Sequence, residues 1–167
     1  ISLGAEMAMT DRVFTSTDRV QNEDDQIEKW SGEKAASEII ALKFPMGCWN
    51  KLYNVEMIRK NNLYFSVPWH GEGMYFSTMA AQYSNFVAVG HRKVYNYRTD
   101  NAESSSTKYN VQNGINGLWN IKNIYNVSVI RTSSFLHIVE WHIWFNYNFL
   151  LRQIVGTNSQ RKYWKEY

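Results

Sequence analysis

The sequence has very little cysteine, with Cys48 alone among 167 residues. A disulfide framework needs paired cysteines and a cysteine-rich zinc site needs several, so the composition excludes both. Cys48 is therefore interpreted as a small buried apolar residue. A chain without disulfides fits a reducing compartment, and we expect a cytoplasmic location, with or without attachment to a membrane.

Blocks of one charge are also missing. The chain has 18 Lys and Arg against 15 Asp and Glu, a net charge of +3, and the basic residues are scattered. Nucleic-acid-binding proteins gather positive charge in one run or on one face. Nucleic acid is therefore not an expected partner.

Long uninterrupted apolar runs are absent as well. The most aromatic stretch, residues 135–155, contains Glu140, His142, Asn146 and Arg152 among others, and such groups are costly in hydrocarbon. A transmembrane helix is not expected there. We expect this stretch to pack on the preceding helix, with an interfacial or partner-facing position as the alternative. The first residues also lack the basic and apolar regions of a signal peptide.

The residues that are present favour one folded domain. Hydrophobic residues make up 44% of the chain and aromatic residues 16%, and a chain of this length buries about 70% of its unfolded surface. Short apolar runs predict strands at 3–14, 63–67, 86–89 and 94–97. Helical spacing and capping residues predict helices at 32–43, 54–62, 71–84, 109–130 and 135–155. Polar composition predicts loops at 15–30 and 99–108. The fold class is therefore α/β.

The last predicted helix has a regular apolar period. We expect its inward row to consist of Leu136, Val139, Ile143, Tyr147, Leu150 and Ile154, which repeat at helical spacing.

Residues able to carry chemistry gather in three blocks, 48–53, 69–76 and 95–107. In the second block, His70 and Glu72 stand at a turn that enters a helix, with a glycine on each side of Glu72. A carboxylate in that place can act as a general base or accept hydrogen bonds from sugar hydroxyls. The alternative is that Glu72 only complements the helix dipole.

These blocks, in this order, resemble the C-terminal half of family 2 glycosyltransferases of bacterial polysaccharide and cell-wall synthesis. The matching residues are 50–53, 61–65, 71–76 and 95–107, and the resemblance covers residues 3–127. It implies part of a GT-A mixed sheet with flanking helices and a C-terminal helix pair. It also implies two segments, the C-terminal half of the GT-A domain at 1–108 and a helical extension at 109–167.

The resemblance implies transfer of a sugar from a nucleotide-diphospho-sugar to a saccharide acceptor. Glu72 is then the expected catalytic residue. The expected substrate-binding residues are Trp69, His70, Lys51, Tyr53, Arg98 and Ser106. For Lys51 and Tyr53 a structural role is an equal alternative, and for Arg98 and Ser106 the alternative is a solvated loop. Trp49 and Trp69 are candidates for stacking on sugar rings, with a place in the core as the alternative.

The sequence departs from the family in two ways. Gly73 stands where the family has the Asp that serves as the base, the second residue of a Glu-Asp pair. Glu72 then either takes over the base role or keeps only a part in binding the acceptor, which would leave the site impaired or inactive. Nothing precedes Ile1 that corresponds to the donor-binding half, so the ligands for the expected Mg²⁺ or Mn²⁺ are largely missing and no metal-binding residue is assigned. His70 and His91 are candidates for completing a metal shell, and the alternative is that each is a hydrogen-bonded surface or core residue. We expect an acceptor-side fragment, and the alternative is a non-catalytic carbohydrate-binding or interaction module.

The expected partners follow from the same resemblance. They are the nucleotide-sugar donor and the saccharide acceptor. A second copy of the chain is also an expected partner, because the apolar surface that a donor half would cover is otherwise exposed. The aromatic C-terminal helix makes peripheral contact with a membrane a further expectation.

Overall fold

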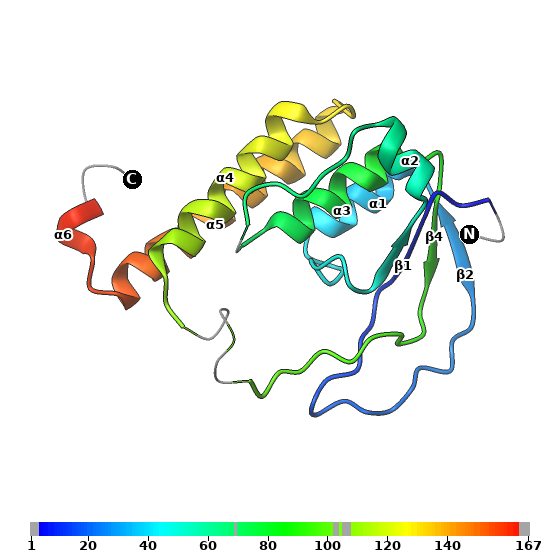
Figure 1. Ribbon diagram of the computed structural model, residues 1–167, viewed down its shortest axis with the longest axis horizontal. Helices are drawn as coiled ribbons and strands as arrows, with labels where there is room; N and C mark the ends of the chain where they lie inside the picture. The colour runs from blue at the N-terminus through cyan, green and yellow to red at the C-terminus, as the bar shows by residue number, and fades with distance from the viewer. Residues whose placement is uncertain (1–3, 69, 102–103, 105–107, 164–167) are drawn as a thin grey trace.

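A four-stranded sheet and a layer of helices make up the computed structural model, which describes residues 4–68, 70–101, 104 and 108–163 (Figure 1). The strands are β1 (Met7–Thr10), β2 (Ile27–Trp30), β3 (Lys51–Tyr53) and β4 (Val87–Gly90). The helices are α1 (Gly32–Ile40), α2 (Val55–Lys60), α3 (Glu72–Tyr83), α4 (Val111–Val127), α5 (Ser133–Gly156) and α6 (Gln160–Tyr163). The fold is α/β, as the sequence predicts.

The sheet is mixed and has the order β2-β4-β1-β3. Its central strands β1 and β4 run parallel, with Met7 opposite Val87. The two edge strands run antiparallel to their neighbours. The carboxyl ends of β1 and β4 therefore meet at the same edge of the sheet, where parallel α/β sheets commonly bind ligands.

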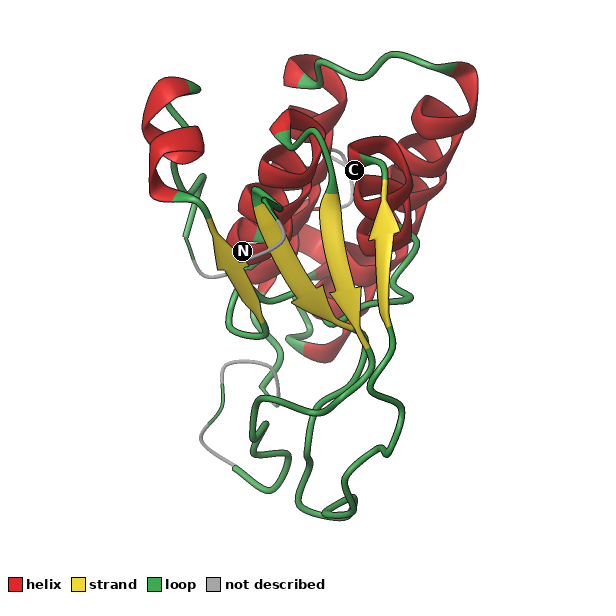
Figure 2. Cartoon of the chain, turned by 90° about the vertical axis from the view of Figure 1, so that its right-hand side faces the viewer, coloured by secondary structure: helices red, strands yellow, loops and turns green. Residues whose placement is uncertain are grey.

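One face of the sheet is covered by helices (Figure 2). Met7, Met9, Val87 and Val89 are buried there in the same core as α1, α3, α4 and α5. Side chains alternate between the two faces of a strand, so Leu52 lies on the other face and is 63% exposed. No helix of the described chain covers that second face.

Local signals account for the helix starts. The side chains of Ser31, Asn54, Asn110 and Thr132 each accept a hydrogen bond from a backbone N–H in the first turn of α1, α2, α4 and α5, which is the usual role of an N-cap residue. All five predicted helices are confirmed. The first ends earlier than predicted, because Leu42 has a left-handed φ of 61°.

The strand predictions need correction. Residues 63–66 are irregular rather than a strand, and 94–97 contribute only an isolated bridge between Asn96 and Phe14. The first strand is shorter than predicted. The predicted loop 15–30 ends in strand β2, which pairs with β4, and β3 was not predicted. Backbone pairing with β1 and β4 makes β2 and β3 strands, although both are short and β2 carries Glu28 and Lys29.

The inward row of α5 is also different from the prediction. Val139, Leu150 and Ile154 are buried, but Tyr147 is exposed, and His142 and Asn146 are buried instead. The His142 ring is 2.5 Å from the Ile40 carbonyl oxygen through Nδ1, and Asn146 donates to the carbonyl of His142. Polar side chains that make hydrogen bonds within the protein, as these two do, can be buried in a core. None of the helices in the described residues has the length and apolarity of a membrane span.

Candidate functional site

Lys51 organises the turn that precedes β3. Its Nζ donates to the carbonyl oxygens of Pro45 (2.7 Å) and Gly47 (2.6 Å) and to Oδ1 of Asn50 (2.7 Å), and the residue is 7% exposed. Burial lowers the pKa of Lys51 to about 7. The three acceptors match the three N–H bonds of an ammonium group. The amine is thus fully engaged by protein atoms.

Tyr53 connects β3 to α3. Its hydroxyl lies 2.8 Å from the Ser77 hydroxyl, and its ring meets the Phe76 ring edge to face. Burial raises the pKa of Tyr53 well above its ordinary value. The hydroxyl is therefore neutral at physiological pH and helps to fix α3 against the sheet.

Glu72 is the first residue of α3. The preceding Gly71 has a left-handed φ of 82°, a backbone conformation that glycine adopts without steric cost. The Glu72 carboxylate lies at the positive end of the helix dipole. Its Oε2 is buried and has no hydrogen-bond partner among the described residues, and buried oxygens of that kind are uncommon. Glu72 thus has an unused acceptor, which the helix dipole alone does not explain.

Gly73 brings the start of α3 against the turn before β3. A Cβ atom at this position would lie 3.3 Å from both the Cys48 nitrogen and the Gly47 Cα atom. Any side chain at Gly73 would have to displace this backbone by a few tenths of an ångström. Close packing is therefore a structural reason for glycine at this position. Cys48 itself is half-buried.

His70 belongs to the contact between the start of α3 and the C-terminal helices. Its ring stacks on Phe149, with centroids 4.5 Å apart, and its carbonyl accepts from Nδ2 of Asn120. Burial lowers the pKa of His70, and the nearby Glu72 carboxylate partly opposes this effect. The structure thus places His70 close to Glu72, with a neutral imidazole favoured.

A cleft of about 440 Å³ lies on the second face of the sheet, which is a typical size for a small-molecule site. Its lining residues are Ala8, Met9, Thr10, Ile27, Trp49, Asn50, Lys51, Leu52, Ala88, Gly90 and Val94. The Trp49 ring stacks on Tyr95 and Tyr97, at centroid distances of 4.4 and 5.2 Å. Of these three aromatic residues, Trp49 lines the cleft.

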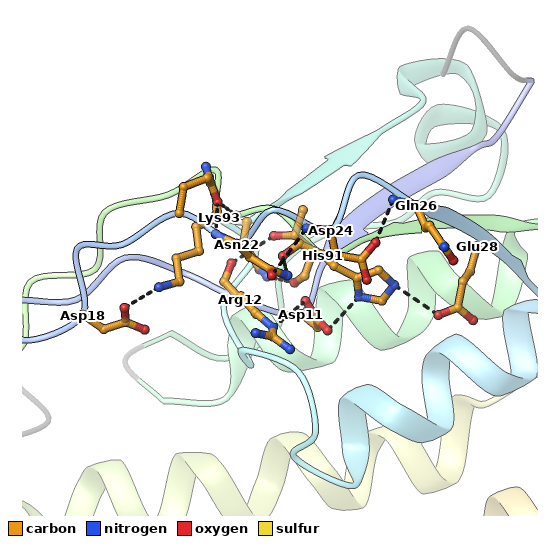
Figure 3. A network of polar contacts seen from close by, with 12 residues as sticks. Asp11, Arg12, Asp18, Asn22, Asp24, Gln26, Glu28, His91 and Lys93 are labelled. Carbon is orange, nitrogen blue, oxygen red and sulfur yellow. Dashed lines mark hydrogen bonds and ion pairs between the residues drawn. The ribbon is translucent and has the colours of Figure 1, made fainter.

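A polar network lies at the carboxyl ends of β1 and β4 (Figure 3). Nδ1 of His91 is 2.9 Å from Asp11 Oδ2, and Nε2 is 3.2 Å from Glu28 Oε1. The hydrogen bond with Asp11 is the main cause of the raised pKa of His91. Both ring nitrogens are therefore engaged by carboxylates.

The same network holds the segment that follows β1. The side chain of Gln21 accepts from the Lys93 N–H (2.8 Å) and donates to the Lys93 carbonyl, and Lys93 also pairs with Asp18. Sequence reasoning missed this arrangement. In the structure Asp11 and His91 each come directly after a strand. The predicted strand at 3–14 enclosed Asp11, and the parallel pairing of the two strands was not known.

The remaining predicted residues are less informative. Arg98 is exposed in an irregular segment. Trp69 and Ser106 lie outside the described residues. Within the described ranges, no group of three His, Cys, Asp or Glu side chains could hold a metal ion, so His70 and His91 do not form a metal shell there.

The structure brings the three blocks together around residues 47–53. The first block contacts the second through Gly73 and through the Tyr53 ring, which meets Phe76. It contacts the third through Trp49, which stacks on Tyr95 and Tyr97. The second and third blocks, about 20 and 45 positions after the first in the sequence, thus both lie against it.

Comparison of the sequence with models of known protein families finds no match, and no curated protein matches it either.

Proposed function

We propose that this chain is the acceptor-side half of a family 2 glycosyltransferase with part of a GT-A sheet. The substrates would be a nucleotide-diphospho-sugar and a saccharide acceptor in polysaccharide or cell-wall glycan synthesis. The observation that carries the proposal is the mutual contact of the three blocks on which the resemblance rests. The mixed sheet with parallel central strands is compatible with it.

In this proposal Glu72 is the catalytic base. It takes the proton of an acceptor hydroxyl while that oxygen forms a bond to the anomeric carbon of the donor, and the bond from that carbon to the nucleotide diphosphate breaks. The unused Oε2 of Glu72 supplies the required acceptor. Lys51 and Tyr53 act by positioning, because their polar atoms already bind protein groups.

The divalent ion expected for the family does not fit the described residues. None of their carboxylate, imidazole and thiol groups form a set that could hold Mg²⁺ or Mn²⁺.

The test is saccharide binding by calorimetry, with a panel of gluco-, galacto- and manno-oligosaccharides. Glu72→Gln should weaken binding about tenfold, because a hydrogen bond to a charged acceptor contributes about 1.5–3 kcal/mol. Glu56→Gln is the matched control, since Glu56 also lies in the first turn of a helix but is exposed. Equal binding by both variants would count against a role for Glu72 at the acceptor.

A second candidate function is a non-catalytic carbohydrate-binding module. The cleft with the stacked Trp49 favours it, because sugar-binding sites often use aromatic surfaces. Gly90→Val would fill the cleft at little steric cost, since a Cβ there meets only Cγ2 of Thr10, at 3.9 Å. Binding that Gly90→Val abolishes and Glu72→Gln leaves intact would favour the module. Release of UDP from UDP-glucose or UDP-galactose would favour the enzyme.

A further inference from the structure

The outward side of α5 is unusually apolar. Its exposed side chains include Trp141 (46% exposed), Trp144 (65%), Phe145 (39%), Leu151 (48%) and Val155 (58%). At about 100° per residue, these five project from the side opposite the buried row that contains Val139, Asn146 and Leu150. We call these five residues the outer α5 face. Single exposed apolar residues need no explanation, but five on one side of a helix, with the Trp141 and Phe145 rings stacked on each other, indicate an interaction surface.

The charged residues of the C-terminal helical segment are almost all positive. Between residues 109 and 163 the sequence has five basic residues, Lys122, Arg131, Arg152, Arg161 and Lys162, and one acidic residue, Glu140. The net charge of this segment exceeds that of the whole chain. Residues 1–108 contribute slightly more acidic than basic groups, so the positive charge is concentrated in the helical C-terminal segment.

Two observations place basic groups beside the outer α5 face. Arg152 is exposed on the same helix, directly after Leu151. Lys122 of α4 donates to the Tyr147 hydroxyl at 2.7 Å and lies 4.9 Å from that ring. Figure 1 shows α4 beside α5, and α6 beyond the C-terminal end of α5, on the side away from the sheet. Arg161 and Lys162 belong to α6.

We infer that the outer α5 face binds peripherally to a membrane surface that contains anionic lipids. Tryptophan rings favour the interface between headgroups and acyl chains, and an apolar helix side flanked by basic residues is the pattern of a helix that lies in that interface. The net positive charge favours anionic headgroups. It disfavours a second copy of the same face, because like charges would then be brought together.

The test is co-sedimentation with vesicles of equimolar phosphatidylcholine and phosphatidylglycerol, compared with phosphatidylcholine alone. The chain should bind the anionic vesicles more tightly, and added salt should weaken that binding. Trp144→Gln should weaken it about tenfold, and Arg152→Gln about fivefold. Tyr64→Gln and Lys60→Gln are matched controls, because both residues are exposed and lie outside the C-terminal helices.

Three results would overturn the inference. The first is an absence of binding to the anionic vesicles, and the second is equal binding to both vesicle types. The third is concentration-dependent self-association that Trp144→Gln removes, which would assign the face to a second copy. Because Trp144 is largely exposed, its variant should keep the thermal midpoint of the parent, and that midpoint shows that any loss of binding is not a loss of folding.

Discussion

Replacement of Lys51 by methionine distinguishes a structural role from a substrate-binding role. Methionine has a similar length and is also flexible and unbranched, so it can follow much of the path of the lysine stem. It cannot donate to the oxygens of Pro45, Gly47 and Asn50, which lie 2.6–2.7 Å from Nζ. The variant therefore removes three hydrogen bonds and leaves the apolar packing largely in place.

The expected loss of stability can be worked out from those bonds. An acceptor that loses its partner in a buried place costs about 1–3 kcal/mol. Asn50 is 2% exposed, whereas Pro45 and Gly47 are only half-buried and regain some hydration. The free energy of unfolding should fall by about 3 kcal/mol, which lowers the thermal midpoint by about 6 to 12 °C for a chain of this size.

Urea denaturation followed by tryptophan fluorescence measures this change. The matched control is Lys43→Met, because the Lys43 amine pairs with Glu38 on the surface and its side chain is 64% exposed. That variant should change stability by less than about 0.5 kcal/mol. Equal stability of the two variants would refute the structural role. If saccharide binding were then lost only in Lys51→Met, the lysine would be a ligand for the substrate.

Two further predictions concern packing and pH. Gly32→Ala should destabilise the protein by roughly 3 kcal/mol, because the added Cβ would overlap the backbone oxygen of Ala81 in α3; an unchanged urea midpoint would show that α1 and α3 adjust freely. The pKa of His91 is raised in the folded state, chiefly by the hydrogen bond with Asp11 and also by Glu28. Its contribution to stability is therefore fully present below the unfolded pKa of about 6.5. That contribution is lost as the pH rises through the folded pKa. The stability difference between the parent and His91→Gln should therefore shrink from acid to alkaline pH, and a constant difference would contradict this assignment.

The helices illustrate what local sequence can predict. Asn54 and its neighbours contain an N-cap signal, and α2 begins where that signal predicts. The long α5 was also predicted, but its inward side was not. His142 can face the core because its ring lies beside the Ile40 carbonyl oxygen. Asn146 can do so because its side chain donates to the His142 carbonyl, one helical turn earlier. The position of Ile40, about a hundred residues earlier, cannot be known from the sequence of α5.

In the candidate site, too, local sequence predicted some features, and contacts between distant segments decided the others. Glu72 and His70 were predicted from a turn between glycines, and the structure places them close together, as their neighbouring positions require. The pairing of His91 with Asp11 and Glu28 depends on strands β1 and β4 lying parallel and on β2 joining them. No short-range pattern contains that information, so this network was missed.

The sequence by itself therefore determined the α/β class, the number and approximate limits of the main helices, and the residue blocks in which chemistry was sought. Those features depend on periodicity and capping, which act over a few residues. The tertiary structure alone decided that no helix among the described residues covers the second face of the sheet, where the cleft lies. It also decided that the amine of Lys51 is held by the turn before β3, and that α5 presents Trp141 and Trp144 outward. These features depend on contacts between distant segments, and such contacts form only when the whole chain packs.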